Sequence, residues 1–181
     1  MSLVAKKLSW EDIKDWPEYQ GRTEIVDGEL IMSPVPGGPH QEICTRLGAR
    51  IFPFVEERNL GTFYSSPVHV VLAEHAHYEP DLCFISRDRL HIYKDPRVEG
   101  PPDLIIEVIS ESNRSHDTVV KFRDYERYGV REYWLVDPRD EHIRVFFLEN
   151  GQYVLLGAFG RGDRIVSRVF AGFSLDPARV F

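Results

Sequence analysis

Residues 101–138 read PPDLIIEVISESNRSHDTVVKFRDYERYGVREYWLVDP, and this stretch decides the fold. Residues 104–110 form a nearly continuous apolar run, and residues 132–136 (EYWLV) form another. Short apolar runs of this kind are typical of strands that are covered on both faces of a sheet. Between them, residues 117–128 carry apolar side chains at helical spacing and end at Gly129, which indicates an amphipathic helix. This order of elements predicts a sheet with helices packed on it.

The segments on either side of this stretch extend the same pattern. The expected elements are a capped helix in the first twenty residues with a capping box at Ser9 and Asp12, a hairpin over 23–32 that turns at Asp27-Gly28, a helix from about His40 to Arg58, strands over 62–72 and 81–86, and a hairpin over 142–147 and 153–158. Pro53 should kink or interrupt the long helix, and Pro67 should break the strand over 62–72. The order α-ββ-α-βββ-α-β-ββ predicts an α/β fold with a central mixed sheet flanked by helices.

The composition is that of a folded protein. The chain has 181 residues, of which 43% are hydrophobic and 28% charged. This length predicts a single domain over residues 1–181, with residues 1–20 as an N-terminal helical extension. No apolar run approaches the roughly 20 residues needed to span a bilayer, and the first residues lack the apolar segment of a secretory signal. We therefore expect a cytoplasmic protein with no membrane association, in which Cys44 and Cys83 are free, buried thiols.

The net charge bears on nucleic-acid binding. It is −7, with 29 acidic residues against 22 basic ones. Nucleic-acid-binding proteins usually carry a basic surface, because neutralising phosphates drives their affinity. The charge therefore argues against a nucleic-acid ligand unless a local basic face exists. The candidates for such a face are Arg87, Arg89, Lys94, Arg97, Arg114, Lys121, Arg123 and Arg127.

Glu107 interrupts the apolar run over 104–110. In strand geometry the even-numbered residues of this run share one face, and Glu107 shares the other with its odd-numbered neighbours. Both faces are otherwise apolar, so the carboxylate is expected in a covered or cleft position. An unpaired buried carboxylate needs a cation, a metal or a proton. The alternative to a functional site is a structural ion pair or a glutamate at the end of a strand.

Asp81 is a second carboxylate in a similar setting. It follows Pro80 and opens the short apolar run DLCFIS. If two adjacent strands place Asp81 and Glu107 near the same end, their oxygens would form a site for Mg²⁺ or Mn²⁺. The alternative for Asp81 alone is an Asx turn that starts the strand.

Lys121 is the third candidate. On the helix over 117–128 it falls on the same side as Val120, Tyr125 and Tyr128, so this side includes core-type residues. A lysine in this position can reach a scissile phosphate or its attacking water and act as a point charge. The alternative is a surface lysine whose stem covers apolar neighbours.

Several titratable residues carry less weight. Asp103 is expected to have a structural role at the start of its strand, and Asp117 is expected to pair with Lys121 one helical turn away. His75 and His77 form an HxH pair of the kind that binds metals. The acidic residues around that pair favour a solvated loop instead.

These segments together resemble the PD-(D/E)xK nuclease superfamily and, within it, the Uma2 family of restriction-endonuclease-like proteins. The resemblance covers about Thr23 to Phe181 and rests on TEIVDGEL, SSPVHVVL, EPDLCFIS, the stretch over 101–138 and the closing GFSLDPARVF. It implies a restriction endonuclease-like core and a metal-dependent nuclease with Mg²⁺ or Mn²⁺ as cofactor and DNA as substrate. By the same resemblance, Pro80-Asp81 is the PD element and Glu107 is the acid of the (D/E)xK element.

The lysine of that motif is displaced in this chain. Ile109 stands where the superfamily has its lysine. The resemblance to the Uma2 family implies that the lysine comes from the following helix, where Lys121 matches. Glu24 and His40 lie in other segments that match the family, and they are weaker candidates for lining the same cleft.

Three functional hypotheses follow. The first is a metal-dependent endonuclease in which Asp81, Glu107 and the Val108 carbonyl hold Mg²⁺, while Lys121 orients the attacking water or offsets developing charge. The second is a catalytically degenerate nuclease-like scaffold that binds a nucleic acid or protein partner, which the acidic net charge and the displaced lysine favour. The third is a toxin or defence component that needs a partner for activity. A homodimer is also expected, from an exposed hairpin over RVFFLENGQYVLLGAF.

Overall fold

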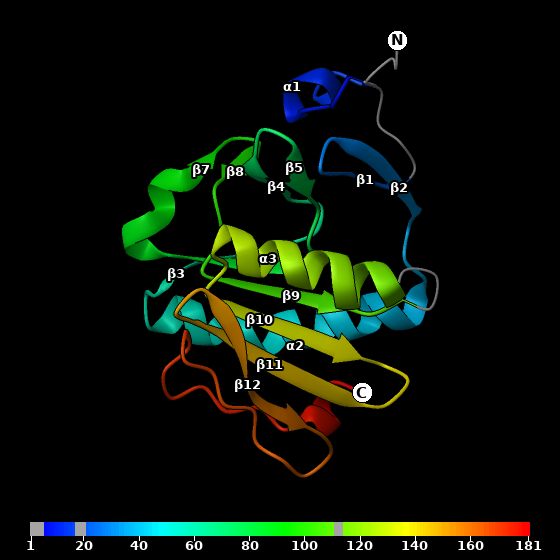
Figure 1. Ribbon diagram of the computed structural model, residues 1–181. Coiled ribbons are helices and arrows are strands. Elements are labelled where there is room, and N and C mark those ends of the chain that lie inside the picture. The colour runs from blue at the N-terminus through cyan, green and yellow to red at the C-terminus, as the bar shows by residue number, and fades with distance from the viewer. Residues whose placement is uncertain (1–5, 17–20, 111–113) are drawn as a thin grey trace.

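The elements of the fold are taken from a computed structural model that describes residues 6–16, 21–110 and 114–181 (Figure 1). Its helices are α1 (Trp10–Ile13), α2 (Gly38–Glu57) and α3 (Phe122–Tyr128), with 3₁₀ turns η1 (Arg87–Ile92) and η3 (Pro177–Arg179) and a π-helical turn η2 (His116–Lys121). Its strands are β1 (Gly21–Val26), β2 (Glu29–Pro34), β3 (Gly61–Ser65), β4 (His69–Ala73), β5 (Ala76–Tyr78), β6 (Leu82–Ser86), β7 (Tyr93–Lys94), β8 (Arg97–Glu99), β9 (Leu104–Val108), β10 (Glu132–Asp137), β11 (His142–Glu149) and β12 (Gln152–Phe159). The mixed α/β fold class is confirmed.

The predicted mixed sheet flanked by helices is confirmed, and the strands form a second mixed sheet beside it. The first sheet has the order β2-β1-β5-β4-β8-β7, and the second has the order β12-β11-β10-β9-β6-β3. The division falls at Pro67, between β3 and β4, which pair in different sheets. Proline has no N–H to donate to a strand ladder, and this is why the run over 62–72 separates into two strands.

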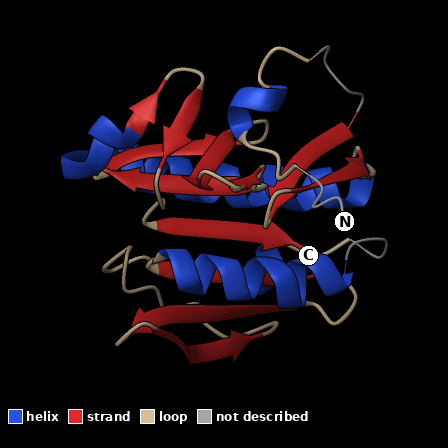
Figure 2. Cartoon of the chain, turned by 45° about the horizontal axis from the view of Figure 1, so that its top comes forward, coloured by secondary structure: helices blue, strands red, loops and turns tan. Residues whose placement is uncertain are grey.

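Helices cover both faces of the second sheet. Figure 1 shows α3 in front of β9 and β10 and α2 behind them, and Figure 2 shows the helices against the strands from a second direction. On the α2 side, Leu104 and Ile106 belong to the same core cluster as Leu47 of α2. On the α3 side, Ile105 belongs to a cluster that includes Tyr125 and residues of the first sheet. The predicted alternation of faces along β9 is therefore confirmed.

The helix expected over 117–128 begins differently from the prediction. Its first part, His116–Lys121, is a π-helical turn, and α3 follows directly. The helix ends at Gly129 as predicted, with φ of 88° and an N–H that donates to the Tyr125 carbonyl at 3.1 Å. Single π-turns inside helices are frequent at functional sites, and Lys121 is the last residue of this one.

Two helices differ from the prediction: α1 is shorter than expected, and α2 continues through Pro53. The helix α1 is only four residues long, although the carboxylate of Asp12 accepts from the Ser9 N–H at 2.9 Å as in the expected capping box. The remainder of the extension over 1–20 lies partly outside the described residues. Pro53 does not interrupt α2, which is helical from Gly38 to Glu57.

Both predicted hairpins are confirmed. In the turn between β1 and β2, Asp27 and Gly28 have φ of 49° and 87°. In the turn between β11 and β12, Asn150 and Gly151 have φ of 51° and 80°. Positive φ at both central residues is the signature of the two-residue turn that matches strand twist. The homodimer expected from the second hairpin stays a prediction.

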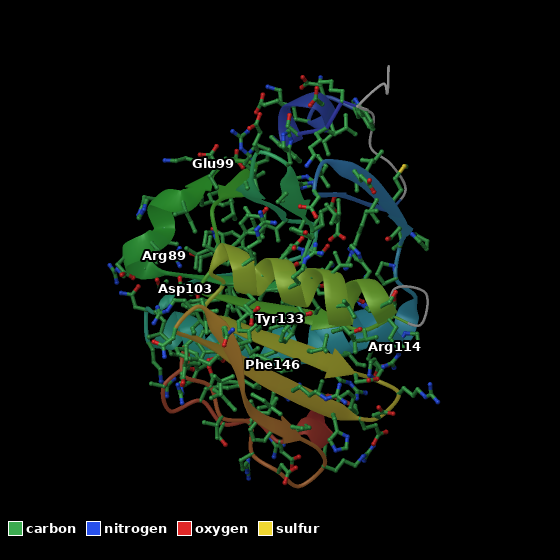
Figure 3. The ribbon with its side chains drawn as sticks, in the orientation of Figure 1. Arg89, Glu99, Asp103, Arg114, Tyr133 and Phe146 are labelled. Carbon is green, nitrogen blue, oxygen red and sulfur yellow. The ribbon has the colours of Figure 1, made fainter. Side chains whose placement is uncertain are left out.

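Ion pairs hold the two ends of the central strands (Figure 3). At the start of β9, the buried Asp103 accepts from the Ser86 N–H at 2.8 Å and pairs with Arg89 at 2.9 Å, so its predicted structural role is confirmed. At the opposite end of β10, Arg114 donates to both oxygens of Asp137 at 2.8 and 2.9 Å.

The structure also bears on membrane spans and on the two cysteines. Within the described residues, no helix is long and apolar enough to cross a membrane. Both cysteines are free thiols; Cys83 is buried, and Cys44 is only partly so.

Candidate functional site

Asp81 and Glu107 lie opposite each other on neighbouring strands. β6 and β9 are antiparallel and pair Leu82 with Ile106, so the same register continued by one position sets Asp81 opposite Glu107. The backbone N–H of Val108 donates to Asp81 Oδ2 at 2.7 Å. Directly opposed residues of an antiparallel pair have Cβ atoms about 4.5–5.5 Å apart, so the two carboxylates share one end of the sheet as predicted.

Glu107 is buried and held by two donors from the helix above it. Its side chain is about 1% exposed. The Tyr125 hydroxyl donates to Glu107 Oε1 at 2.7 Å, and Lys121 Nζ donates to the same oxygen at 3.0 Å. The expectation of a covered carboxylate with a cationic partner is therefore confirmed.

Lys121 is buried among three carboxylates. Its Nζ lies 3.0 Å from Glu107 Oε1, 3.0 Å from Glu24 Oε1 and 3.6 Å from Asp117 Oδ1. Its side chain is 2% exposed. The alternative of a surface lysine is wrong, and the expected pairing with Asp117 is confirmed.

Glu24 joins this cluster from the first sheet. Besides its contact with Lys121, its Oε2 lies 2.7 Å from His116 Nε2, and its Oε1 accepts from the backbone N–H of Glu79 at 3.0 Å. Because Glu24 stands on β1 and Glu107 on β9, Lys121 bridges the two sheets.

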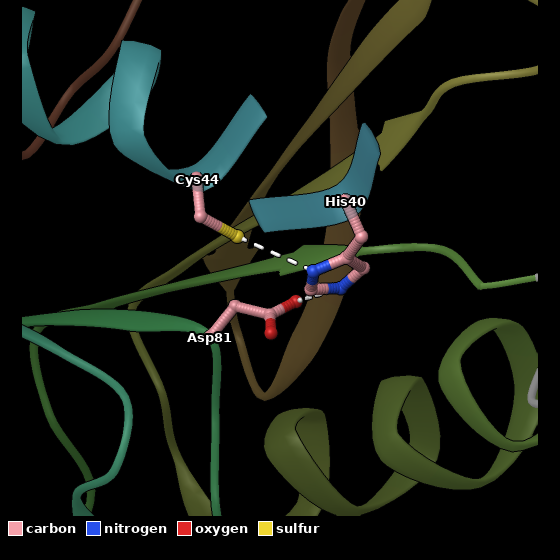
Figure 4. A group of neighbouring side chains, drawn as sticks. All are labelled: His40, Cys44 and Asp81. Atoms are coloured by element: carbon pink, nitrogen blue, oxygen red, sulfur yellow. Dashed lines mark hydrogen bonds and ion pairs between the residues drawn. The ribbon is translucent and has the colours of Figure 1, made fainter. Parts of the chain in front are cut away.

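Asp81 has a separate set of partners. The guanidinium of Arg22 pairs with Oδ1, and His40 Nε2 lies 3.1 Å from Oδ2. The other ring nitrogen of His40, Nδ1, faces Cys44 Sγ at 3.6 Å, one turn further along α2 (Figure 4). Contacts at both nitrogens fix the orientation of the imidazole beside Asp81.

The charges of these groups depend on one another. Burial raises the pKa of Glu107 to about 7, while Lys121 opposes this shift and Asp81 adds to it. Burial also raises the pKa of Glu24, but Lys121 and His116 outweigh it and bring this pKa down to about 2. Burial lowers the pKa of Lys121, but Glu107 and Glu24 outweigh it and hold this pKa above its ordinary value. Lys121 is therefore a cation at neutral pH, and the charge of Glu107 is less compensated than that of Glu24.

Two hollows adjoin the site. A cavity of about 100 Å³ is lined by residues that include Arg22, Glu24, His40, Val108, Asp117 and Lys121. A wider groove of about 550 Å³ runs beside α2 and is lined by residues that include Arg22, Cys44, Phe52, Phe63 and Asp81. Arg22 lines both hollows, so this residue lies between the small cavity and the larger groove.

The donor atoms of this site suit a hard divalent cation. Two carboxylates and a backbone carbonyl, that of Val108, are the oxygen ligands that Mg²⁺ and Mn²⁺ take. Val108 lines the small cavity. In the described part of the chain, a compact group of metal-type ligands also joins Asp81 to His40 and Cys44. Burial raises the pKa of the Cys44 thiol, which disfavours a thiolate ligand there.

Three contributors to the site escaped the sequence-based prediction. Arg22 precedes Glu24 by two residues, and Tyr125 follows Lys121 by four, so strand and helix periodicity carried a signal for both. His116 lies five residues before Lys121. Residues with this spacing share one side of the helix only because the turn is π-helical. The weaker candidates Glu24 and His40 both lie in the cluster.

Among the described residues, most candidates for a basic face lie in ion pairs with acids. Arg89 pairs with Asp103, Arg97 with Glu99 and Glu11, Arg114 with Asp137, and Arg123 and Arg127 with Asp27. Lys121 is buried. Most of the expected basic residues are therefore paired with acids, and the two cations that line the cavity, Arg22 and Lys121, are paired with carboxylates as well.

Comparisons with known proteins bear on the fold and the family. The chain is similar to a solved structure described as "a putative nuclease belonging to DUF820" from Anabaena variabilis ATCC 29413, with a TM-score of 0.80 and 18% sequence identity over 96% of this chain and 97% of that one. This likeness shows a shared fold. No curated protein matches the chain. The model of the Uma2 family, described as "Putative restriction endonuclease", matches residues 10–178, and the protein therefore belongs to the Uma2 family.

Proposed function

We propose that this protein is a metal-dependent endonuclease that hydrolyses phosphodiester bonds of DNA at Asp81, Glu107 and Lys121. The observation that carries the proposal is the convergence of these groups from three elements: Asp81 opposite Glu107 across β6 and β9, and Lys121 Nζ at 3.0 Å from Glu107 Oε1. The family and the nuclease-like fold support it.

Asp81, Glu107 and the Val108 carbonyl would hold Mg²⁺ or Mn²⁺. Such an ion, when bound, supplies a Lewis acid for the phosphate oxygens. The Val108 N–H and His40 hold Asp81 in place, and the Tyr125 hydroxyl holds Glu107. Fixed ligands of this kind favour catalysis, because little reorganisation is needed during the reaction.

Lys121 and Arg22 supply the positive charge of the site. Lys121 is a buried cation on the wall of the small cavity, where it offsets charge that develops on the phosphate or orients the attacking water. Arg22 lines the cavity and the groove, and its planar guanidinium suits a phosphate. The groove of about 550 Å³ has the volume of a small-molecule site, roughly 300–1,000 Å³, so it offers room for part of a substrate next to the cavity.

The test is cleavage of plasmid and single-stranded DNA with Mg²⁺ or Mn²⁺ by wild type and Glu107→Gln. The variant keeps an acceptor for the Tyr125 hydroxyl but loses the carboxylate charge, so we expect cleavage to fall at least about 100-fold, by analogy with the loss of one stabilising group. The matched control is Glu29→Gln, an exposed acid at the start of β2, which should cleave as wild type does. Circular dichroism checks folding, and full cleavage by Glu107→Gln would refute the assignment.

The rival function is a nuclease-like scaffold without hydrolysis. The pairing of most basic residues with acids favours it, because such pairs leave little charge for phosphates. Calorimetric titration with Mn²⁺ separates the two. An endonuclease should bind Mn²⁺ in wild type and lose this binding in Asp81→Asn. A scaffold that has lost the site should show no binding that depends on Asp81.

A further inference from the structure

A second cluster of metal-type ligands lies on the first sheet. In the antiparallel pair of β4 and β5, Val71 pairs with His77, and the same register sets His69 opposite Glu79. His77 and Glu79 are two residues apart on an extended segment, so their side chains lie on the same face. One face of this sheet thus presents two imidazoles and a carboxylate. The expected solvated loop holds for Glu74, which is exposed in a turn, but it was wrong for His77 and Glu79, which are both buried.

The distances within the cluster match those between ligands of one metal ion. His69 Nδ1 lies 3.1 Å from His77 Nε2 and 3.7 Å from Glu79 Oε1. All three ligand atoms lie within 4.8 Å of one another. With metal–ligand bonds of about 2.0–2.2 Å, two ligands of a tetrahedral ion are roughly 3.3–3.6 Å apart. Small adjustments of the side chains would therefore place all three atoms around one ion.

The surroundings of the cluster favour a built site over a chance contact. The Trp10 ring packs against both imidazoles, with centroids 4.5 Å from His69 and 4.8 Å from His77. The Thr23 N–H donates to Glu79 Oε1 at 3.1 Å and orients that carboxylate. These contacts come from α1 and β1, so residues distant in sequence hold the ligands in place.

The cluster is also reachable from outside. A cavity of about 480 Å³ is lined by residues that include His69, His77, Glu79, Trp10 and Trp16. The side chain of His69 is 31% exposed, whereas His77 and Glu79 are buried. The cavity provides an entry path and room for a further ligand such as water.

We propose that His69, His77 and Glu79 bind a divalent transition-metal ion of the zinc class. Two imidazoles and one carboxylate suit such ions, whereas Mg²⁺ prefers oxygen ligands alone. The site is independent of the endonuclease proposal, since it uses different residues and a different class of metal. Because His69 lies on β4, His77 on β5 and Glu79 directly after β5, a bound ion stabilises the first sheet against unfolding.

The experiment titrates chelator-treated protein with Zn²⁺, and with Co²⁺ as a spectroscopic probe. Wild type should bind one equivalent of Zn²⁺ with a rise in Tm, and Co²⁺ should give the visible absorption of a low-symmetry, four- or five-coordinate ion. In His69→Gln, affinity should fall by more than the roughly 10- to 100-fold that loss of an outer-shell partner costs. The control His91→Gln, at an exposed histidine of η1, should bind as wild type does.

X-ray absorption of wild type loaded with one equivalent of Zn²⁺ identifies the ligands even if His69→Gln fails to fold. Two imidazoles and no sulfur would support the proposal. One imidazole with sulfur would place the ion at His40 and Cys44 and overturn it, as would unchanged binding by a folded His69→Gln. Failure of the endonuclease proposal would appear in the cleavage assay alone, so the two results are distinguishable.

Discussion

Lys121 Nζ lies 3.0 Å from Glu107 Oε1, although the two residues are fourteen positions apart in the chain. Ile109, two residues after Glu107, occupies the position where the superfamily motif has its lysine, and it is buried in the same core cluster as Tyr125. The amine therefore reaches the carboxylate from the π-helical turn that precedes α3 instead of from β9. The strand keeps its apolar packing, and the positive charge comes from the helix above it.

Replacing Lys121 should affect both stability and cleavage. Lys121→Met keeps the apolar stem but removes the cation from between Glu24 and Glu107. Removing one partner of a buried ion pair costs about 3–5 kcal/mol, because the remaining charge is uncompensated. Urea unfolding should register this loss, and DNA cleavage should fall to background. Lys94→Met, at an exposed lysine of β7, should change neither measurement. Unchanged stability of Lys121→Met would contradict the buried geometry.

The Tyr125 hydroxyl positions Glu107, so Tyr125→Phe should weaken metal binding while the fold is kept. The variant loses the 2.7 Å hydrogen bond to Glu107 Oε1 but keeps the aromatic ring. A hydrogen bond to a charged group contributes about 1.5–3 kcal/mol, so we expect the affinity for Mn²⁺ to fall roughly 10-fold or more in calorimetry. Tyr128→Phe, on the same helix, is the control. Equal Mn²⁺ affinity in both variants would remove Tyr125 from the site.

Acid should destabilise the protein partly through Asp103. Burial raises the pKa of this carboxyl, but the Ser86 N–H and Arg89 outweigh it and hold the pKa below its ordinary value of 3.8. Between the folded and unfolded pKa values the unfolded chain binds more protons, so stability falls as the pH falls through this window and is fully present above about pH 5.

Asp103→Asn should therefore lose about 1.5–3 kcal/mol at neutral pH, the range for a hydrogen bond to a charged group. Its free energy of unfolding should also depend less on pH below about pH 5 than that of wild type. Asp88→Asn, at an exposed residue of η1, is the control. Parallel stability–pH curves for wild type and Asp103→Asn would contradict this account.

Gly61 should tolerate no side chain at the start of β3. A Cβ at this position would lie 2.1 Å from the carbonyl oxygen of Ile85 and 2.9 Å from the N–H nitrogen of Arg87, and neither backbone atom is free to move. Gly129 also has a positive φ, but a Cβ there would meet nothing within 4 Å. Gly129→Ala should therefore cost only the roughly 1–2 kcal/mol of a left-handed backbone, and Gly61→Ala should cost more. Equal Tm values for the two variants would contradict this contrast.

The elements of the fold follow from local rules, and most were predictable. The Asp27-Gly28 and Asn150-Gly151 turns, the stop at Gly129 and the apolar strand around Glu107 each depend on residues close together in the chain. The division into two sheets was not predictable in this way. It depends on which strand β4 pairs with, and its partners β5 and β8 are chosen by long-range packing.

The residues of the candidate site also differ in whether the sequence or only the tertiary structure identifies them. The sequence by itself determined that Glu107 is a carboxylate within an apolar strand, and resemblance to a family drew attention to Asp81 and Lys121. Only the tertiary structure brought Arg22 and Tyr125 to these groups and buried His77 and Glu79 beneath Trp10. Turns and strand or helix periodicity depend on residues that are neighbours in the chain, so the sequence determines them. Burial and ionic partners depend on elements that are distant in the chain, so only the tertiary structure determines them.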